Sequence, residues 1–123
     1  MKRILMSITL ISMSAGIAFA APVKTVTSAL GDVLAAENGM TLYTFKKDEV
    51  GKSNCNDACA KNWPPLMATA SDKADGSYTI IERKDATKQW AKDGKPLYFW
   101  AKDVKLGDTT GNGVKDVWDV ARP

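Results

Sequence analysis

The stretch AENGMTLYTFKKD, at residues 36–48, decides the fold, because it recurs 55 residues later as AKDGKPLYFWAKD at residues 91–103. Ala, Gly, Leu, Tyr, Lys and Asp coincide at aligned positions, and the same offset places Trp63 on Trp118 without a gap. Self-similarity at a fixed offset means that the chain holds two copies of one structural unit. This repetition determines the architecture before any local pattern is considered.

Each copy opens with a hairpin signal, Asn38-Gly39 in the first and Asp93-Gly94 in the second. Both dipeptides favour two-residue turns in which both central residues have positive φ, which suits the right-handed twist of the flanking strands. Short segments rich in strand-forming residues flank the two turns, at residues 33–36 and 41–45 and at residues 87–91 and 97–100. We therefore predict one tight hairpin in each copy.

The rest of the chain fits a mainly β protein. Tyr78–Glu82 and Val117–Ala121 are predicted as strands from their β-branched and aromatic content, and residues 68–77 as a connecting loop. We expect a small antiparallel β domain built from two pseudo-equivalent repeats, at about residues 29–74 and 75–123. Neither copy has enough apolar side chains for its own core, so we expect the two to share a single sheet system.

Residues 1–20 have the pattern of a secretory signal peptide. Lys2 and Arg3 precede an apolar segment at residues 4–15, and Ala18-Phe19-Ala20 places small residues at the cleavage-determining positions. The apolar segment is shorter than the ~20 residues of a membrane-spanning helix. We expect cleavage after Ala20, which gives a periplasmic or secreted protein with no stable membrane anchor.

Composition excludes several classes of protein. The chain of 123 residues has no His, which excludes Ser-His and Cys-His catalytic pairs, His-ligated zinc and a His-ligated haem. After loss of Lys2 and Arg3, 15 basic and 14 acidic side chains remain, and they alternate along the chain. This balance gives little support to nucleic-acid binding.

The repeated motifs, at residues 43–48 and 98–103, both fit the pattern Y-x-[FWY]-x-x-D. With Cys55, Cys59 and Trp63-Pro64-Pro65-Leu66 after the first copy, the chain resembles a bacterial secreted-repeat family of predicted lipoproteins, from about residue 29 to the end. The resemblance implies export and the two-repeat architecture, and no biochemical function is established for the family. The chain differs in lacking the lipidation Cys of many relatives and in carrying Asp119 where a His often follows the second Trp.

The motif has a structural and a functional interpretation. In a strand, Tyr43 lies on the same face as Phe45, and Tyr98 on the same face as Trp100, so the aromatic pairs can stabilise a sheet while the aspartates accept turn N–H bonds. Alternatively, the aromatic side chains form a groove for a flat ligand and the aspartates anchor it. The candidate binding residues are Tyr43, Phe45, Asp48, Tyr98, Trp100 and Asp103.

Cys55 and Cys59 are expected to form a disulfide, as is usual for two thiols in an exported chain. Residues four apart in a regular helix hold their Cβ atoms too far apart for this bond, so we predict a tightened turn over residues 54–61. A redox pair would require C-x-x-C spacing, and a soft-metal site could add only Met40 and Met67 as ligands.

Residues 108–119 approximate a calcium-binding loop. Oxygen-bearing side chains occur at loop positions 1, 3, 5, 9 and 12 and Gly at position 6, so the weak calcium candidates are Asp108, Asn112, Asp116 and Asp119. Thr110 replaces the usual acid or amide, and a strand rather than a helix follows the loop. We therefore interpret the segment as a glycine-rich turn and expect no metal.

Three functional classes remain open from the sequence. A non-catalytic exported binding or structural module is favoured, because no activated nucleophile or tuned acid–base pair is visible. The alternatives are a hydrolase that uses Asp48 and Asp103 as paired carboxylates, and a periplasmic redox or metal-binding protein that uses Cys55 and Cys59. We expect no cofactor, and the ligand or partner could be a small molecule, a glycan or a protein.

Overall fold

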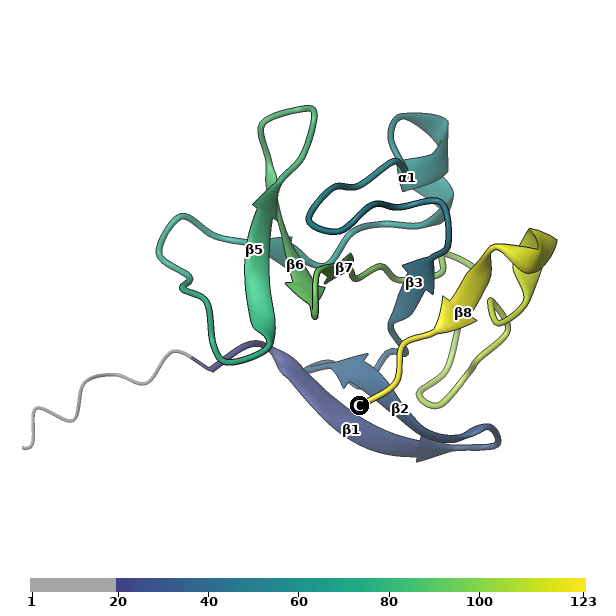
Figure 1. The fold of residues 1–123 in the computed structure, drawn as a ribbon. Helices are drawn as coiled ribbons and strands as arrows, with labels where there is room; N and C mark the ends of the chain where they lie inside the picture. Colours follow the sequence, from purple (N-terminus) through teal and green to yellow (C-terminus); the bar gives the residue numbers. More distant parts are fainter. Residues whose placement is uncertain (1–19) are drawn as a thin grey trace, which may run out of the picture.

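The computed structural model describes residues 20–123, so the predicted signal peptide lies, except for Ala20, outside the described residues (Figure 1). The described part is mainly β, as predicted. Within it, no helix is both long and apolar enough to cross a membrane. The elements, in chain order, are β1 (Val23–Ser28), β2 (Gly31–Ala36), β3 (Tyr43–Phe45), α1 (Ala58–Asn62), β4 (Met67–Ala68), β5 (Tyr78–Glu82), β6 (Lys88–Lys92), β7 (Lys95–Pro96), the 3-10 turn η1 (Val114–Asp116) and β8 (Trp118–Val120).

The strands form three small antiparallel sheets rather than the single sheet system predicted. β1 pairs with β2, β3 with β8, and β6 with β4, β5 and β7. Two of these pairings cross between the copies, because β3 and β4 come from the first copy and β8 and β6 from the second. Each copy thus completes a sheet of the other, and an isolated copy would leave strand edges unpaired.

Two equivalent rings of backbone hydrogen bonds join the copies where the sheets meet. In the first, Leu34 N donates to Ala121 O at 2.9 Å, Ala121 N to Leu42 O at 2.8 Å, and Leu42 N to Leu34 O at 2.9 Å. Trp90, Leu66 and Leu97 repeat this pattern, with distances of 2.9, 2.9 and 3.0 Å. Each ring combines one hairpin with a segment of the other copy, so the two-fold pseudosymmetry of the sequence is present in the backbone.

The two predicted hairpins form, but their turns differ. Asp93 (φ 52°) and Gly94 (φ 81°) make the predicted two-residue turn between β6 and β7. The first turn was predicted wrongly, because only Gly39 (φ 86°) has positive φ and Ala36 N bonds Met40 O across a loop of three residues. In three-residue hairpin loops of this kind a type I turn is followed by one residue with positive φ, which here is Gly39.

The extra residue in this loop has a counterpart elsewhere. The second copy has a three-residue loop, residues 84–86, between β5 and β6, where the first copy has only Ala29 and Leu30 between β1 and β2. The first copy is one residue shorter in the β1–β2 loop and one residue longer in the loop after β2. Equivalent residues of the two copies are therefore 56 positions apart in β2 and β6 and 55 positions apart in the rest of the chain. Ala36 is therefore equivalent to Lys92 in space, and not to the identical Ala91.

Alternating residues divide the interior into two cores. Val33, Tyr43, Tyr98 and Val120 point into an aromatic core, and their chain neighbours point into a second core that contains Trp90. This is the alternation expected of extended strands. The neighbours that enter the second core are Leu34, Leu42, Leu97 and Ala121.

Gly111 lies where the aromatic core is most crowded. A methyl group at this position would lie 2.8 Å from Trp63 Cη2, 2.9 Å from Trp100 Cγ and 2.9 Å from Tyr43 Cε2. Because the three rings are rigid, we predict that Gly111→Ala lowers the free energy of unfolding by about 1–3 kcal/mol. The measurement is a denaturant titration, and a variant with the wild-type midpoint would show that the packing at Gly111 is looser than described.

Candidate functional site

The repeated motif joins the two copies through exchanged hydrogen bonds, which we call the tyrosine–aspartate latch (Tyr43, Asp48, Tyr98 and Asp103). Tyr43 Oη donates to Asp103 Oδ2 at 2.6 Å, and Tyr98 Oη donates to Asp48 Oδ2 at 2.7 Å. The two tyrosines also pair through their backbones, with N···O distances of 2.8 and 3.0 Å. Each motif thus supplies the tyrosine for one bond and the aspartate for the other.

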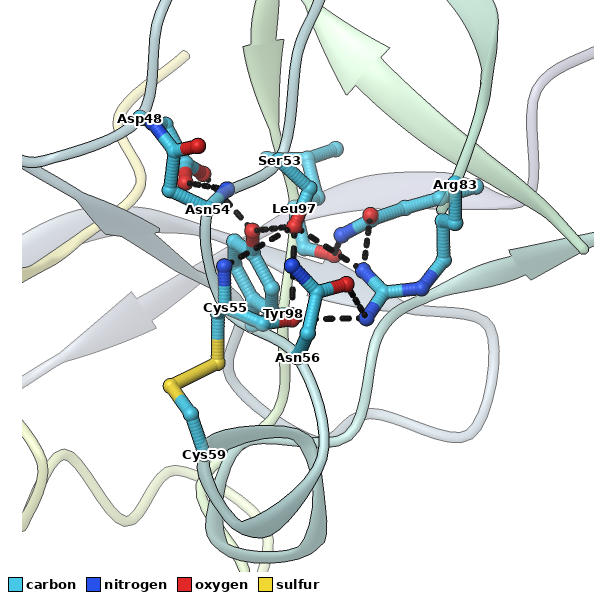
Figure 2. The surroundings of a disulfide bond; sticks show 10 residues. Asp48, Ser53, Asn54, Cys55, Asn56, Cys59, Arg83, Leu97 and Tyr98 are labelled. Carbon is cyan, nitrogen blue, oxygen red and sulfur yellow. Dashed lines mark hydrogen bonds between the residues drawn. A yellow bond between two sulfur atoms is a disulfide. The ribbon is translucent and has the colours of Figure 1, made fainter. Parts of the chain in front are cut away.

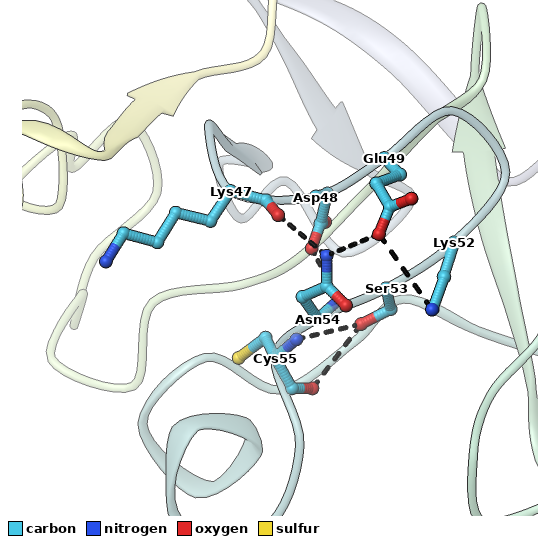
Figure 3. Close-up of polar contacts among 7 residues, drawn as sticks. All are labelled: Lys47, Asp48, Glu49, Lys52, Ser53, Asn54 and Cys55. Atoms are coloured by element: carbon cyan, nitrogen blue, oxygen red, sulfur yellow. Dashed lines mark hydrogen bonds and ion pairs between the residues drawn. The ribbon is translucent and has the colours of Figure 1, made fainter.

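Loops position the two aspartates through their remaining oxygen. Asp48 Oδ1 accepts the Asn54 N–H at 2.7 Å, and the Asn54 side chain in turn donates to Lys47 O at 2.7 Å (Figure 3). Asp103 Oδ1 accepts both the backbone N–H and the hydroxyl of Thr110, at 3.1 and 2.6 Å. The predicted role of the aspartates as acceptors of turn N–H bonds is present, and the bond to the tyrosine of the other copy is added to it.

Burial dominates the electrostatics of the latch. It raises the pKa of both Tyr43 and Tyr98 well above 10.0, and the hydrogen bonds from their hydroxyls to the partner carboxylates raise it further. Desolvation also raises the pKa of Asp48, although the Asn54 N–H, the Tyr98 hydroxyl and the charge of Arg83 oppose it. Both phenols therefore keep their protons over the neutral range and act as donors.

Four aromatic rings form a continuous stack beside the latch. Phe45 stacks on Trp118 with centroids 4.2 Å apart, Trp118 on Trp63 at 3.8 Å, and Trp63 on Trp100 at 3.9 Å. Each tyrosine of the latch meets the stack edge-on, Tyr43 against Trp63 at 5.4 Å and Tyr98 against Trp118 at 5.1 Å. The pseudosymmetry exchanges Phe45 with Trp100 and Trp63 with Trp118, so the two copies share one aromatic core.

The predicted binding residues occupy different depths. Tyr43 and Tyr98 have no exposed surface, whereas Phe45 and Trp100 are half-buried at the two ends of the stack. The sequence indicated that each tyrosine shares a face with the aromatic residue two positions later. It gave no sign that each aspartate bonds the tyrosine of the other copy. A ligand-binding role for the six residues stays a prediction.

Cys55 and Cys59 form the expected disulfide, with Cα atoms 5.2 Å apart. The prediction of a tightened turn over residues 54–61 is only partly correct, because residues 54–57 are non-helical and α1 begins at residue 58. Cys55 precedes Asp57, whose φ of 55° breaks the helical path, but Cys59 lies inside α1. The bridge closes because the chain bends sharply before the helix begins.

A buried arginine that sequence reasoning missed lies beside the disulfide. Arg83 is 5% exposed, and Figure 2 shows its guanidinium directed toward the segment that carries Ser53 and Cys55. It donates to Ser53 Oγ at 3.0 Å, Gln89 Oε1 at 2.7 Å, Cys55 O at 2.6 Å and Asn56 Oδ1 at 3.4 Å. All four acceptors are neutral. The sequence did not indicate the burial of Arg83, because the segment around it is charged and has the composition of an exposed turn.

Arg83 is connected to the latch through Ser53. The Tyr98 hydroxyl donates its single proton to Asp48, so Ser53 Oγ is the donor in its 2.6 Å contact with Tyr98 Oη. Ser53 Oγ in turn accepts from Arg83 Nη1. The cation and the carboxylate are thus linked by three consecutive hydrogen bonds without touching each other.

Arg83 and two of the residues that it bonds, Ser53 and Asn56, line a cavity of about 520 Å³, which we call the Arg83 pocket. Lys52 and Lys84 add two ammonium groups to its lining, and Glu82 adds one carboxylate. Ser53, Asn54 and Asn56 add neutral polar groups. The pocket therefore combines an excess of positive charge with neutral hydrogen-bonding groups.

The four calcium candidates do not converge. Asp108 Oδ2 accepts the N–H groups of Val104 and Lys105, which lowers the pKa of its carboxyl, and Asn112 Oδ1 accepts the Val120 N–H at 3.0 Å. Asp119 lies 3.8 Å from Lys46, and Asp116 belongs to η1. Within residues 20–123, no three His, Cys, Asp or Glu side chains are grouped as a metal site would require.

Together these features define a disulfide-bonded β protein made of two interlocked repeats. Residues 24–67 and 79–122 each match a family described as a secreted repeat of unknown function, so the chain belongs to that family, as predicted. The matches begin in or near β1 and β5, earlier in the first copy than the predicted start at about residue 29. No curated protein and no solved structure matches the chain significantly.

The buried phenols predict alkaline unfolding. An ordinary tyrosine has a pKa of 10.0, and the folded-state pKa of Tyr43 and Tyr98 is higher. Above the unfolded value the folded state therefore holds protons that the unfolded state releases. The free energy of unfolding should fall by about 1.4 kcal/mol per pH unit for each of the two tyrosines, until the pH passes their folded pKa.

The measurement is a series of denaturant titrations at alkaline pH, combined with the ultraviolet absorbance of tyrosinate. Tyrosinate formation at Tyr43 and Tyr98 should accompany unfolding, and Tyr43→Phe should reduce the slope by the contribution of one tyrosine, about 1.4 kcal/mol per pH unit. Ionisation of all three tyrosines in a folded protein would show that the latch hydroxyls are accessible to solvent.

Proposed function

We propose that the chain is a non-catalytic exported binding module that takes a small anionic ligand in the Arg83 pocket. The observation that carries this proposal is the side chain of Arg83, which is 5% exposed and donates only to neutral acceptors. The four contacts occupy the N–H groups of Nη1 and Nη2, so a carboxylate, sulfate or phosphate group in the pocket would balance the guanidinium charge at short range and accept charge-assisted hydrogen bonds from the Lys52 and Lys84 ammonium groups.

The charge of Arg83 is costly where it stands. A buried cation without a directly paired anion loses several kcal/mol of hydration free energy, which neutral hydrogen bonds compensate only in part. Asp48 is connected only through Ser53 and Tyr98, so it does not neutralise the pocket itself. The lining carries Arg83, Lys52 and Lys84 against Glu82, and Lys52 also lies 3.9 Å from Glu49 in an exposed ion pair, so the cations still exceed the anions by one and an anion would balance this charge.

The fold does not require this cluster. The pseudosymmetry places Ser28 where the second copy has Arg83, and Val33 where it has Gln89. Ser28 bonds only within its own turn, and Val33 packs in the aromatic core. Since the first copy builds the same hairpin without a buried arginine, the cluster is better explained by a ligand than by architecture.

The alternatives have weaker support. A carboxylate-based hydrolase needs an acid and a base free to meet substrate, and both oxygens of Asp48 and of Asp103 already accept hydrogen bonds within the protein. A metal-binding role for Cys55 and Cys59 would need free thiolates, whereas the two sulfurs are bonded to each other, and a redox pair would have C-x-x-C rather than the C-x-x-x-C spacing of this chain.

The test is a titration of the protein with sulfate and with succinate by calorimetry, at constant ionic strength. The variant Lys52→Gln/Lys84→Gln changes only exposed rim residues and should fold normally. We expect it to weaken the dissociation constant by about threefold to tenfold, as partly screened charge interactions do. Lys24→Gln/Lys73→Gln, an equal loss of two positive charges at exposed residues outside the Arg83 pocket, is the matched control and should leave affinity unchanged.

A second readout uses stability. An anion at 100 times its dissociation constant should raise the free energy of unfolding by about 2.7 kcal/mol. Absence of binding for both anions, or equal losses in the rim variant and the Lys24→Gln/Lys73→Gln control, would overturn the proposal.

A further inference from the structure

We propose a second ligand site, a cleft at the Phe45 end of the ring stack that takes a flat aromatic molecule with an anionic group. The cleft has a volume of about 380 Å³ and shares no lining residue with the Arg83 pocket. We call it the aromatic cleft. Its lining includes Phe45, Lys47, Asn62, Trp63, Lys115 and Trp118.

Three of the four stacked rings line this cleft. Trp63 and Trp118 are only 4% and 2% exposed, so their positions are fixed by the core, and Phe45 is half-buried beside them. A further ring would therefore contact mainly Phe45, which the two buried indoles hold in place, so the contact costs little entropy. A volume of this size accommodates a ligand of one or two fused rings.

Two ammonium groups determine the charge of the ligand. Lys47 and Lys115 both line the cleft, and neither takes part in any ion pair within residues 20–123. The side chain of Lys47 extends away from the Asp48–Asn54 contacts (Figure 3). An anionic group on the ligand would pair with these lysines, and the Asn62 amide adds a neutral donor and acceptor.

The backbone that presents Lys115 is in an uncommon conformation. Lys115 (φ 54°) and the following Asp116 (φ 62°) are both left-handed, although neither is a glycine. Each such residue costs free energy, and strained backbone of this kind clusters at functional sites. In the first copy the position of Lys115 corresponds to Ala60, which lies within the ordinary helix α1.

The Trp100 end of the ring stack is the pseudosymmetric counterpart of the aromatic cleft, and a lysine of the protein covers the last ring there. Lys102, the counterpart of Lys47, places its ammonium 5.8 Å from the ring centroid of Trp100, the counterpart of Phe45. This cation–π contact covers the terminal ring with a side chain of the protein itself. At the Phe45 end the equivalent lysine instead lines an open cleft, so the two ends differ in the feature that a ligand would use.

The experiment titrates the protein with naphthalene-2-sulfonate, with 2-naphthol as the neutral ring and methanesulfonate as the ring-free anion. Binding is located by the NMR signals of the Trp63 and Trp118 indole N–H groups. We expect naphthalene-2-sulfonate to shift both signals, 2-naphthol to bind about threefold to fivefold more weakly, and methanesulfonate to leave both signals unmoved.

The variants assign the charge. Lys47→Gln/Lys115→Gln should weaken the binding of naphthalene-2-sulfonate by about fivefold to tenfold, and the matched control Lys84→Gln/Lys102→Gln, which removes the same charge outside the aromatic cleft, should stay within about twofold of the wild type. Unshifted indole signals, equal binding of 2-naphthol, or an equal loss in Lys84→Gln/Lys102→Gln would overturn the proposal.

Discussion

The hydrogen bonds exchanged between Tyr43 and Asp103 and between Tyr98 and Asp48 tie the two copies into one protein. Each bond is made by buried phenol and carboxylate groups from different copies, so neither copy can satisfy its own motif. If one copy separated, a buried hydroxyl and a desolvated carboxylate would lose their partners, and such losses typically cost about 1–3 kcal/mol each. The crossed strand pairs and the shared ring stack require the same arrangement.

The pseudosymmetry also separates architecture from candidate function. Three features are present in both copies and are explained by folding alone. They are the tyrosine–aspartate latch, the stacked aromatic side chains and the cyclic sets of backbone hydrogen bonds. Features present in one copy are the buried Arg83, the disulfide between Cys55 and Cys59, and the left-handed Lys115. These features lie at or beside the two proposed sites, where the repeated architecture does not account for them.

The sequence was sufficient for those parts of the fold that depend on local pattern. The strand at Tyr78–Glu82, the turn at Asp93-Gly94, the disulfide and the two-repeat organisation follow from propensity, turn chemistry and self-similarity. β1 was missed although it is rich in Val and Thr, because none of its residues is fully buried and they carry no regular apolar alternation. The first turn was assigned the wrong length because Asn-Gly occurs in both two-residue and three-residue loops.

The candidate sites were harder to predict, because they depend on contacts between distant residues. The sequence places Asp48 near Tyr43, and nothing in the spacing shows that its hydroxyl partner is Tyr98. Arg83 stands in the polar segment ERKDATK, which has the composition of an exposed turn, and its burial follows only from the position of Ser53 and Cys55 in the folded chain. A polar side chain that is buried by residues far away in the sequence leaves no periodic pattern in its own segment.

The most direct test of the exchanged latch is a pair of double-mutant cycles on the free energy of unfolding. One combines Tyr43→Phe with Asp103→Asn, across the copies, and the other combines Tyr43→Phe with Asp48→Asn, within one motif. The exchange predicts a coupling energy of about 1–3 kcal/mol in the first cycle and less than about 0.5 kcal/mol in the second. Strong coupling within the motif and none across the copies would contradict it.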